Sequence, residues 1–315
     1  MKLLAKTLSY LLLTFIALFL IAPFAWMFLI SLRPSKSPIP PLNEILPFEQ
    51  REVSQGGRPV TAQEKASTEG TVKALAQNPR HVPKTEAHFA PHFDNYSFVL
   101  FHPNLPVARF FFNSLFVTLS VVFGQLMIAS MAAYGFARLR FRGRDWVFAL
   151  FLGSMMFAGP VTQIPVYLLL KSLGWLDTYW ALIVPGVSSA FSIFLLRQFF
   201  MQIPKELDEA ARMDGAGDFR IYWRVTLPLS KAALATCAAF TFIGVWTDFF
   251  GPLIYTNTTE MRTLEVGLSI YKNSYGGQNW PLQMTAAVIV MLPLLVVFLF
   301  TQRYFVKGIT VGSIK

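Results

Sequence analysis

The sequence predicts an all-α membrane protein with about six transmembrane helices, and three observations support that prediction. The chain has 315 residues, of which 54% are hydrophobic and only 14% are charged. Soluble globular domains carry roughly 25% charged residues. The mean hydropathy is +0.48, and the apolar residues form long runs. These features exclude an ordinary soluble domain.

Six apolar runs are long enough to cross a bilayer, which takes about 20 residues. They cover about Tyr10–Ile30, Asn113–Phe136, Trp146–Leu170, Tyr179–Leu196, Ala232–Tyr255 and Met284–Phe300. The first run is longer than the core of a cleaved signal peptide and lacks a small-residue cleavage site, so we interpret it as a retained helix. Several runs contain proline, which membrane helices tolerate as kinks.

Basic residues indicate the orientation of the chain. The net charge is +10, and lysines and arginines gather after the second and fourth runs and in the tail, as they do in cytoplasmic loops. The short loops on the other side hold only Lys171, Arg262 and Lys272. We therefore expect both termini to be cytoplasmic. Nucleic-acid binding explains the basic charge less well, because many of the charges lie at the ends of apolar runs.

The runs divide the chain into four parts. These are an N-terminal end with the first helix at 1–35, an external loop at 36–112 with a polar insert at 42–90, a core transmembrane domain at 113–304 with a cytoplasmic loop at 200–231, and a cytoplasmic tail at 305–315.

All four histidines lie in the external loop, at His81, His88, His92 and His102. His88 and His92 would share one face of a helix, but Pro91 between them disrupts such a helix. No cysteine joins the histidines as a further metal ligand. We therefore expect no metal site, and we interpret this loop as a solvated or partner-contacting insert.

The loop between the fourth and fifth runs has the pattern of a short helix-turn-helix. Pro204 suits the first turn of a helix, where its missing N–H costs little. Ala210 and Ala211 favour a helix and are small enough for another surface to approach. Gly215 is expected to end that helix, because glycine accepts a left-handed backbone. Asp218 is expected to cap a second helix. Taken alone, the pattern predicts an interfacial connector.

The same loop resembles that of a known family. Glu209, Ala210, Ala211, Asp214, Gly215 and Ala216, followed by Gly217 and Pro228, match the pattern of the EAA loop in permease subunits of bacterial ABC importers. Segments at Asp94-Asn95-Tyr96, Asn113-Ser114 and Ala133–Arg138 are similar to those of sugar-type members. The resemblance covers most of residues 1–35 and 91–315, and nothing carries over to the polar insert.

The resemblance implies a type I ABC importer transmembrane domain of the carbohydrate, maltose-importer type, in the bacterial inner membrane. In that family the loop is a coupling helix that docks onto an ATPase subunit. The tail, with Lys307, Gly308 and Gly312, resembles a tail that reaches into the ATPase dimer. The implied partners are a second permease, two ATPase subunits, an external solute-binding protein and a small-molecule solute.

Nucleotide chemistry is expected on a partner rather than on this chain. The sequence has no G-x-x-x-x-G-K-[ST] phosphate loop. Gly215-Ala216-Gly217 lacks the strand and the lysine that such a loop needs. We therefore expect a transport subunit without enzyme activity or cofactor, with ATP and Mg on the partner ATPase.

Four residues are candidates for the solute path: Gln163, Trp246, Thr247 and Asp248. Ionisable residues inside spans are functional candidates by default. Asp248 could accept hydrogen bonds from a sugar, and Trp246 could stack on a sugar ring. We favour a structural role for Asp248. In that role its carboxylate forms a hydrogen bond with a neighbouring helix or caps a break near Gly251-Pro252.

Three alternatives stay open. An importer for a polyamine or an anion would share the EAA-type loop, although the tail and the second run favour sugars. An ATP-independent secondary transporter or channel would need an ion site, for which Asp248 is the strongest candidate. A membrane-anchored enzyme would use the histidines of the external loop.

Overall fold

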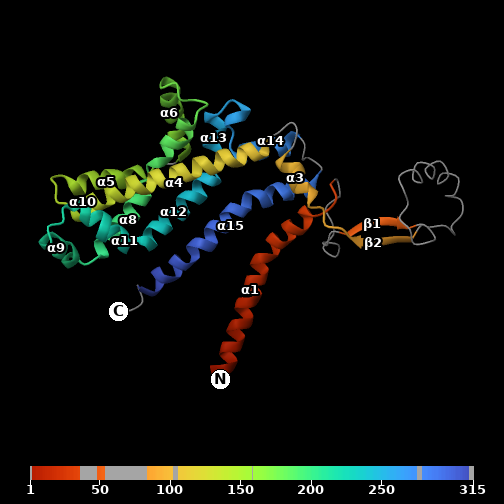
Figure 1. Cartoon of the computed structure of the whole chain (residues 1–315), viewed down its shortest axis with the longest axis horizontal. Coiled ribbons are helices and arrows are strands. Elements are labelled where there is room, and N and C mark those ends of the chain that lie inside the picture. Colours follow the sequence, from red (N-terminus) through yellow and green to blue (C-terminus); the bar gives the residue numbers. More distant parts are fainter. Residues whose placement is uncertain are drawn as a thin grey trace. The chain divides into compact units, whose positions relative to one another are not determined.

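The computed structural model describes residues 2–35, 48–53, 84–101, 106–157, 159–274 and 279–311. These residues are mainly helical (Figure 1) and belong to two compact units. The first unit contains Met1–His102 with Tyr271–Ile289, and the second contains Pro103–Ile270 with Val290–Lys315.

The first unit begins with the apolar helix α1. Its elements are α1 Lys2–Ser31, β1 Phe48–Val53, β2 Lys84–Phe89 and α3 Asp94–Leu100. β1 and β2 pair in antiparallel register, with Phe48 opposite Phe89. The segment 36–112, which was expected to be an external loop, therefore contains a two-stranded ribbon that was not predicted from the sequence.

Hydrogen bonds from Asn95 and Tyr96 join α3 to the end of α1. The Asn95 side-chain amide donates to the carbonyl oxygens of Ser31, at 2.7 Å, and Arg33, at 2.8 Å. The hydroxyls of Tyr96 and Ser31 are 2.7 Å apart. These bonds satisfy carbonyls at the end of α1 that have no partner within the helix.

The second unit holds most of the apolar helices. Its elements are α4 Val107–Arg138, α5 Arg144–Ser154, α6 Gly159–Ser172, α7 Tyr179–Ile183, the 3-10 turn η2 Val184–Val187, α8 Ala190–Gln202, α9 Lys205–Met213, α10 Asp218–Ile221, the π-helical turn η3 Tyr222–Thr226, α11 Leu227–Leu229, α12 Lys231–Trp246, α13 Phe250–Tyr255 and the 3-10 turn η4 Thr259–Met261. Two further helices, α14 Leu264–Ser274 and α15 Trp280–Val311, each have residues in both units.

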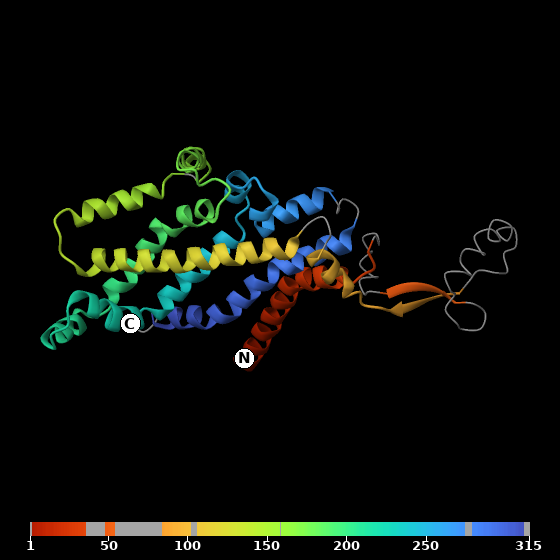
Figure 2. The same cartoon turned by 45° about the horizontal axis from the view of Figure 1, so that its top comes forward.

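The long helix α4 is the centre of the second unit, and α8 and α12 pack along it (Figure 2). A polar link joins the three helices. The Gln125 side-chain amide donates to the hydroxyls of Ser192, at 2.7 Å, and Thr241, at 2.6 Å. Such bonds favour helix association in a membrane, where apolar side chains have no preference for protein over lipid.

Within the described residues, four helical stretches are long and apolar enough to cross a membrane: Ser9–Ser31, Val107–Arg138, Tyr179–Gln202 and Trp280–Arg303. A fifth results if Asp218–Leu229 and Lys231–Trp246, which are bent by 78°, form one span.

The third predicted run, Trp146–Leu170, is not one continuous helix. It is divided into α5, which ends at Ser154, and α6, which begins at Gly159. Pro160 is the second residue of α6, a position that suits the start of a helix. The run Ala232–Tyr255 is also interrupted, between Trp246 and Phe250.

Candidate functional site

The predicted helix-turn-helix is present and begins with α9 directly after Pro204. Gly215 has a φ of +78°, and the predicted stop at this residue is confirmed. The N–H of Ala216 donates to the carbonyl of Ala211 at 2.9 Å, and the N–H of Gly215 donates to that of Arg212 at 3.0 Å. This pair of bonds is the Schellman motif, in which a left-handed residue closes a helix.

The second limb of the loop differs in one detail from the prediction. Asp218 is the first residue of α10 and does not cap it, because the N-cap is Gly217. The Asp218 carboxylate instead accepts a hydrogen bond of 2.6 Å from the Arg212 guanidinium. Beyond α10 the chain continues through η3 and α11, where Pro228 is exposed.

The loop has two limbs, the first formed by α9 and the second by α10 and η3. Both limbs form polar contacts with the last turns of α4. The Arg138 guanidinium, with 3% of its side chain exposed, lies 3.4 Å from the Asp208 carboxylate in α9. It also donates to the carbonyl of Ile203 at 2.6 Å. In the second limb, the Tyr222 hydroxyl in η3 lies 2.8 Å from the Ser130 hydroxyl in α4. The loop is therefore held against α4 at two points.

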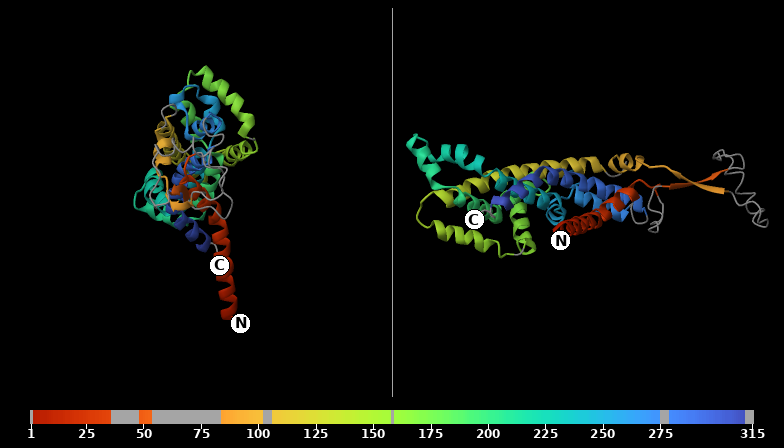
Figure 3. Two further views of the ribbon diagram at one scale, coloured as in Figure 1. Left: turned by 90° about the vertical axis from the view of Figure 1, so that its right-hand side faces the viewer. Right: turned by 90° about the horizontal axis from the view of Figure 1, so that it is seen from below.

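The outer surface of this loop exposes large apolar side chains among charged ones. Glu209, Ala210 and Asp214 are accessible, and four large apolar side chains are exposed beside them: Leu207, Met213, Phe219 and Trp223. The rings of Phe219 and Trp223 stack with centroids 6.5 Å apart. The right-hand view of Figure 3 shows this loop, in teal, at the C-terminal end of α4. Exposed apolar patches of this kind mark interaction surfaces.

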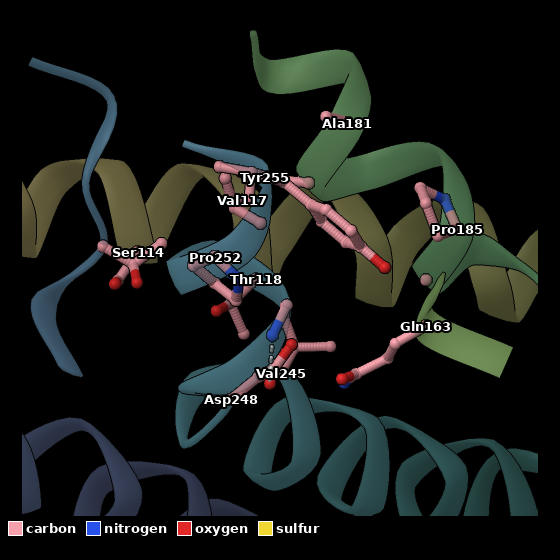
Figure 4. A pocket seen from close by; sticks show the side chains of 14 residues that line it. Ser114, Val117, Thr118, Gln163, Ala181, Pro185, Val245, Asp248, Pro252 and Tyr255 are labelled. Atoms are coloured by element: carbon pink, nitrogen blue, oxygen red, sulfur yellow. Dashed lines mark hydrogen bonds between the residues drawn. The ribbon is translucent and has the colours of Figure 1, made fainter. Parts of the chain in front are cut away.

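A cavity of about 220 Å³ lies between α4, α6, η2 and the α12–α13 break. Its polar lining comprises Ser114, Thr118, Gln163, Asp248, Tyr255 and Thr263. Figure 4 shows the Gln163 amide and the Tyr255 hydroxyl pointing into the space near Asp248. Two of the four candidates for the solute path, Gln163 and Asp248, therefore share one cavity.

Asp248 also supports the break between α12 and α13. Its carboxylate accepts a hydrogen bond of 3.2 Å from the N–H of Gly251. A Cβ atom at Gly251 would lie 2.6 Å from Oδ2 of Asp248, so a larger residue there would displace the Asp248 carboxylate. The capping interpretation of Asp248 agrees with this geometry, while the same carboxylate faces the cavity.

Trp246 and Thr247 are not among the cavity-lining residues. Only 1% of Trp246 is exposed, and its indole N–H donates to the carbonyl of Val290 at 3.0 Å. Its ring stacks on Phe242 with centroids 5.7 Å apart, so it is a core residue and not a platform on the cavity wall. The Thr247 hydroxyl donates to the carbonyl of Ile243, within its own helix.

Four polar cavity residues were not among the candidates from the sequence: Ser114, Thr118, Tyr255 and Thr263. Thr118 lies one helical turn after Ser114, so the two share a face of α4. That spacing was the available signal for Thr118. Tyr255 and Thr263 reach the cavity from chain segments that flank the η4 turn, and no spacing in the sequence indicates their position.

The loop before α7 is hydrogen-bonded to the end of α13 and the residues that follow it, and this contact supports the cavity wall. The Asp177 carboxylate accepts hydrogen bonds from the N–H groups of Asn257, at 2.9 Å, and Thr258, at 3.0 Å. The N–H of Asp177 donates to the carbonyl of Tyr255 at 2.8 Å. Partial burial alone would raise the pKa of Asp177, but the backbone hydrogen bonds outweigh it and lower the pKa.

The remaining predicted residues fall partly outside the described structure. Lys307 and Gly308 belong to the final turns of α15, and Gly312 lies outside the described residues. His81 and His102 also lie outside them. Among the described residues, no three His, Cys, Asp or Glu side chains are grouped closely enough to hold a metal ion.

The family model described as "Binding-protein-dependent transport system inner membrane component" matches residues 115–311. The chain belongs to this family. The match includes the whole of α9 and the α4 residues that hold it. The expected resemblance to importer permeases is thus confirmed, and the chain is a multi-pass inner-membrane component of such a transport system.

The proteins that are similar to this chain include two sugar-transport permeases and a solved transporter structure. The arabinooligosaccharides transport system permease protein AraQ of Bacillus subtilis is 37% identical over 223 residues, which cover 71% of this chain and 79% of AraQ. The trehalose/maltose transport system permease protein MalG of Thermococcus litoralis is 34% identical over 248 residues, covering 78% and 88%.

The solved structure is that of a bacterial ABC transporter involved in the import of the acidic polysaccharide alginate. It matches with a TM-score of 0.68 at 24% identity and covers 96% of both chains. At this identity the likeness shows that the two chains share a fold.

Proposed function

We propose that this chain is the permease subunit of an ATP-driven importer that carries a sugar or sugar-like solute across the bacterial cytoplasmic membrane. The family of the chain and the sugars named in its relatives support this proposal. In the proposed assembly, the chain pairs with a second permease, two ATPase subunits and an external solute-binding protein. ATP and Mg bind to the ATPase subunits.

The observation that carries the proposal is the set of exposed apolar side chains on a loop that is bound to the end of α4. Leu207, Met213 and Phe219 would be costly to leave in water, and a protein cleft would cover them. The small Ala210 between them lets such a partner approach closely. In the proposed topology both termini and this loop are cytoplasmic, and the tail with Lys307, Gly308 and Gly312 contacts the ATPase subunits.

The contacts between the loop and α4 suggest how a movement of the ATPase subunits is transmitted to the solute path. Arg138 holds the loop at one end of α4, and Thr118 lies about 30 Å away along the helix. α4 also packs along α8 and α12. A displacement of the loop would therefore move α4 and, with it, the residues of the solute path. Closure of the ATPase subunits would then switch the access of the path from one side of the membrane to the other.

Site-directed cross-linking tests the docking. A single cysteine is introduced as Met213→Cys in a Cys237→Ala background, because Cys237 is the chain's own buried thiol. A matched control is Met156→Cys, since Met156 and Met213 are both 88% exposed and only Met213 belongs to the loop. A cross-link from position 213 to a co-purified ATPase, absent at position 156, supports the proposal. If the cross-linker reacts equally with the cysteines at positions 213 and 156 and neither is joined to the ATPase, the proposal is contradicted.

A further inference from the structure

The turn between α4 and α5 carries an excess of positive charge. Arg140 and Arg142 are exposed and form no ion pair or hydrogen bond within the described part of the chain. Arg144 pairs with Asp145 at 3.1 Å, but the Asp145 side chain is 77% exposed, and exposed pairs of this kind are weak. Three arginines and one aspartate therefore share residues 140–145.

These arginines line an open hollow of about 570 Å³ that is formed by residues 140–146. The chain turns there at Gly143, whose φ is +84°, a left-handed conformation that glycine adopts without strain. Figure 2 shows this turn at the C-terminal end of α4, the same end at which α9 and α10 lie. The distribution of basic residues assigns that end to the cytoplasmic side.

Helix α5 continues from the hollow with an exposed apolar strip. Phe148 is buried, and its ring lies 5.5 Å from that of Phe136 in α4, between centroids, so this side of α5 is fixed to the protein. Trp146 is 75% exposed, and Val147 and Leu150 are exposed beside it. Because these three residues are three or four positions apart or adjacent, they share the outer side of the helix.

The length of α5 matches the depth of one leaflet. Its 11 residues span about 16 Å at the α-helical rise, which is about half of the roughly 30 Å of hydrocarbon in a bilayer. α5 returns from the turn alongside α4 (Figure 2). The hollow would therefore lie at the level of the head groups, and the apolar strip at the level of the acyl chains, with Trp146 at the boundary, where tryptophan is enriched.

A basic hollow beside an apolar strip fits a ligand with a negative head and an apolar tail. Guanidinium groups bind phosphate through parallel, charge-assisted hydrogen bonds, and basic clusters beside a membrane helix attract anionic lipids. A free phosphate ion would leave the apolar strip uncovered. A zwitterionic head group brings its own cation, which the arginines would repel.

We propose that the α4–α5 turn and the outer side of α5 form a binding site for one anionic phospholipid of the cytoplasmic leaflet. Arg140 and Arg142 hold its phosphate, and Trp146 and Leu150 contact an acyl chain. The site is separate from the cavity beside Asp248 and does not depend on which solute is carried.

Native mass spectrometry of the full chain in detergent tests the site, with phosphatidylglycerol and phosphatidylcholine as the added lipids. Phosphatidylglycerol should bind more tightly. Arg140→Gln with Arg142→Gln should weaken its binding about 25-fold, or about fivefold for each arginine. Lysine at both positions should restore most of the affinity, because it keeps the charge. The matched control is Arg220→Gln with Arg224→Gln, which removes two exposed charges outside the hollow and should leave the affinity unchanged.

The apolar strip separates a lipid site from a site for any anion. Leu150→Asn should weaken the binding of phosphatidylglycerol, and added inorganic phosphate should not displace the lipid. Displacement of the lipid by inorganic phosphate would show a simple anion site and overturn the proposal. Equal affinities for the two lipids, or unaltered affinity after both arginines are replaced by glutamine, would also overturn it.

A protein partner is the other possible occupant, and cross-linking distinguishes it. Arg142→Cys is placed in the Cys237→Ala background, and the complete importer is treated with a cross-linker. A cross-link to the ATPase would show that a protein covers the hollow and would overturn the lipid site. Absence of that cross-link, with phosphatidylglycerol still retained by the purified importer, supports the site. Because the lipid measurements use the chain alone, a failure of the proposed transport function would leave their result unchanged.

Discussion

The Arg138 guanidinium at the end of α4 lies 3.4 Å from the Asp208 carboxylate in the first turn of α9. The same guanidinium holds the Ile203 carbonyl at 2.6 Å, so it fixes both the entry to α9 and its first turn. Only 3% of the Arg138 side chain and 12% of the Asp208 side chain are exposed. The pair is thus a buried attachment between a membrane helix and the proposed docking loop.

Breaking this pair should destabilise the protein strongly. Arg138→Gln or Asp208→Asn leaves the other charge buried and unpaired, which typically costs roughly 3–5 kcal/mol. The double variant Arg138→Met with Asp208→Leu should cost less than either single change. Arg212→Gln breaks an exposed pair with Asp218 and should cost under about 1 kcal/mol. Thermal unfolding in detergent measures all four variants, and equal effects for the buried and exposed pairs would contradict this account.

Gly215→Ala should weaken coupling through the backbone alone. No atom lies within 4 Å of a Cβ at this position, while its φ is +78°, so the cost is the left-handed conformation, about 1–2 kcal/mol. Gly174→Ala is a matched control, because Gly174 also has a positive φ and open space but lies outside the loop. Transport per ATP hydrolysed should fall for Gly215→Ala and stay unchanged for Gly174→Ala. An equal fall in both variants would argue against a special role of the loop stop.

Tyr222→Phe should loosen the second limb of the loop. It removes the 2.8 Å hydrogen bond to Ser130 and should cost about 1 kcal/mol. Tyr179→Phe removes a bond of equal length to Asn113, away from the loop. Hydrogen exchange of η3 should increase in the first variant and not in the second. Unchanged exchange in Tyr222→Phe would show that this bond does not hold the limb.

Asp177 should make stability depend on acid pH. Its folded pKa lies below the ordinary value, so its stabilisation is complete above the unfolded pKa, near 4, and is lost as the pH falls through the folded pKa. Asp177→Asn keeps an acceptor and tolerates the observed φ of +61°. The unfolding temperature of the wild type should therefore fall more steeply below about pH 4 than that of the variant. Parallel curves would contradict the role of the carboxylate.

Local chemistry made Gly215 and α9 predictable, because a helix stop depends on one residue's backbone. The apolar runs were likewise visible, since each needs only about 20 neighbouring residues. The burial of Trp246 could not be predicted from the sequence. It depends on contacts with Phe242, Phe111 and Val290, which lie on three different helices. The Arg138–Asp208 pair was missed for the same reason.

The division of the third run shows a second limit. Hydropathy averages over Trp146–Leu170 and does not register that the chain turns between Ser154 and Gly159. Gly159 and Pro160 were visible in the sequence, but proline is compatible with both a kinked span and a new helix.

Affinity isolation of the chain from its native membrane in mild detergent, with mass spectrometry of the bound proteins, tests the central claim most directly. The account predicts recovery of a P-loop ATPase together with a second permease, and loss of the ATPase when Ala210→Arg blocks the exposed loop. Repeated recovery of the chain alone under gentle conditions would contradict the importer and favour an ATP-independent transporter, with Asp248 as the first residue to change.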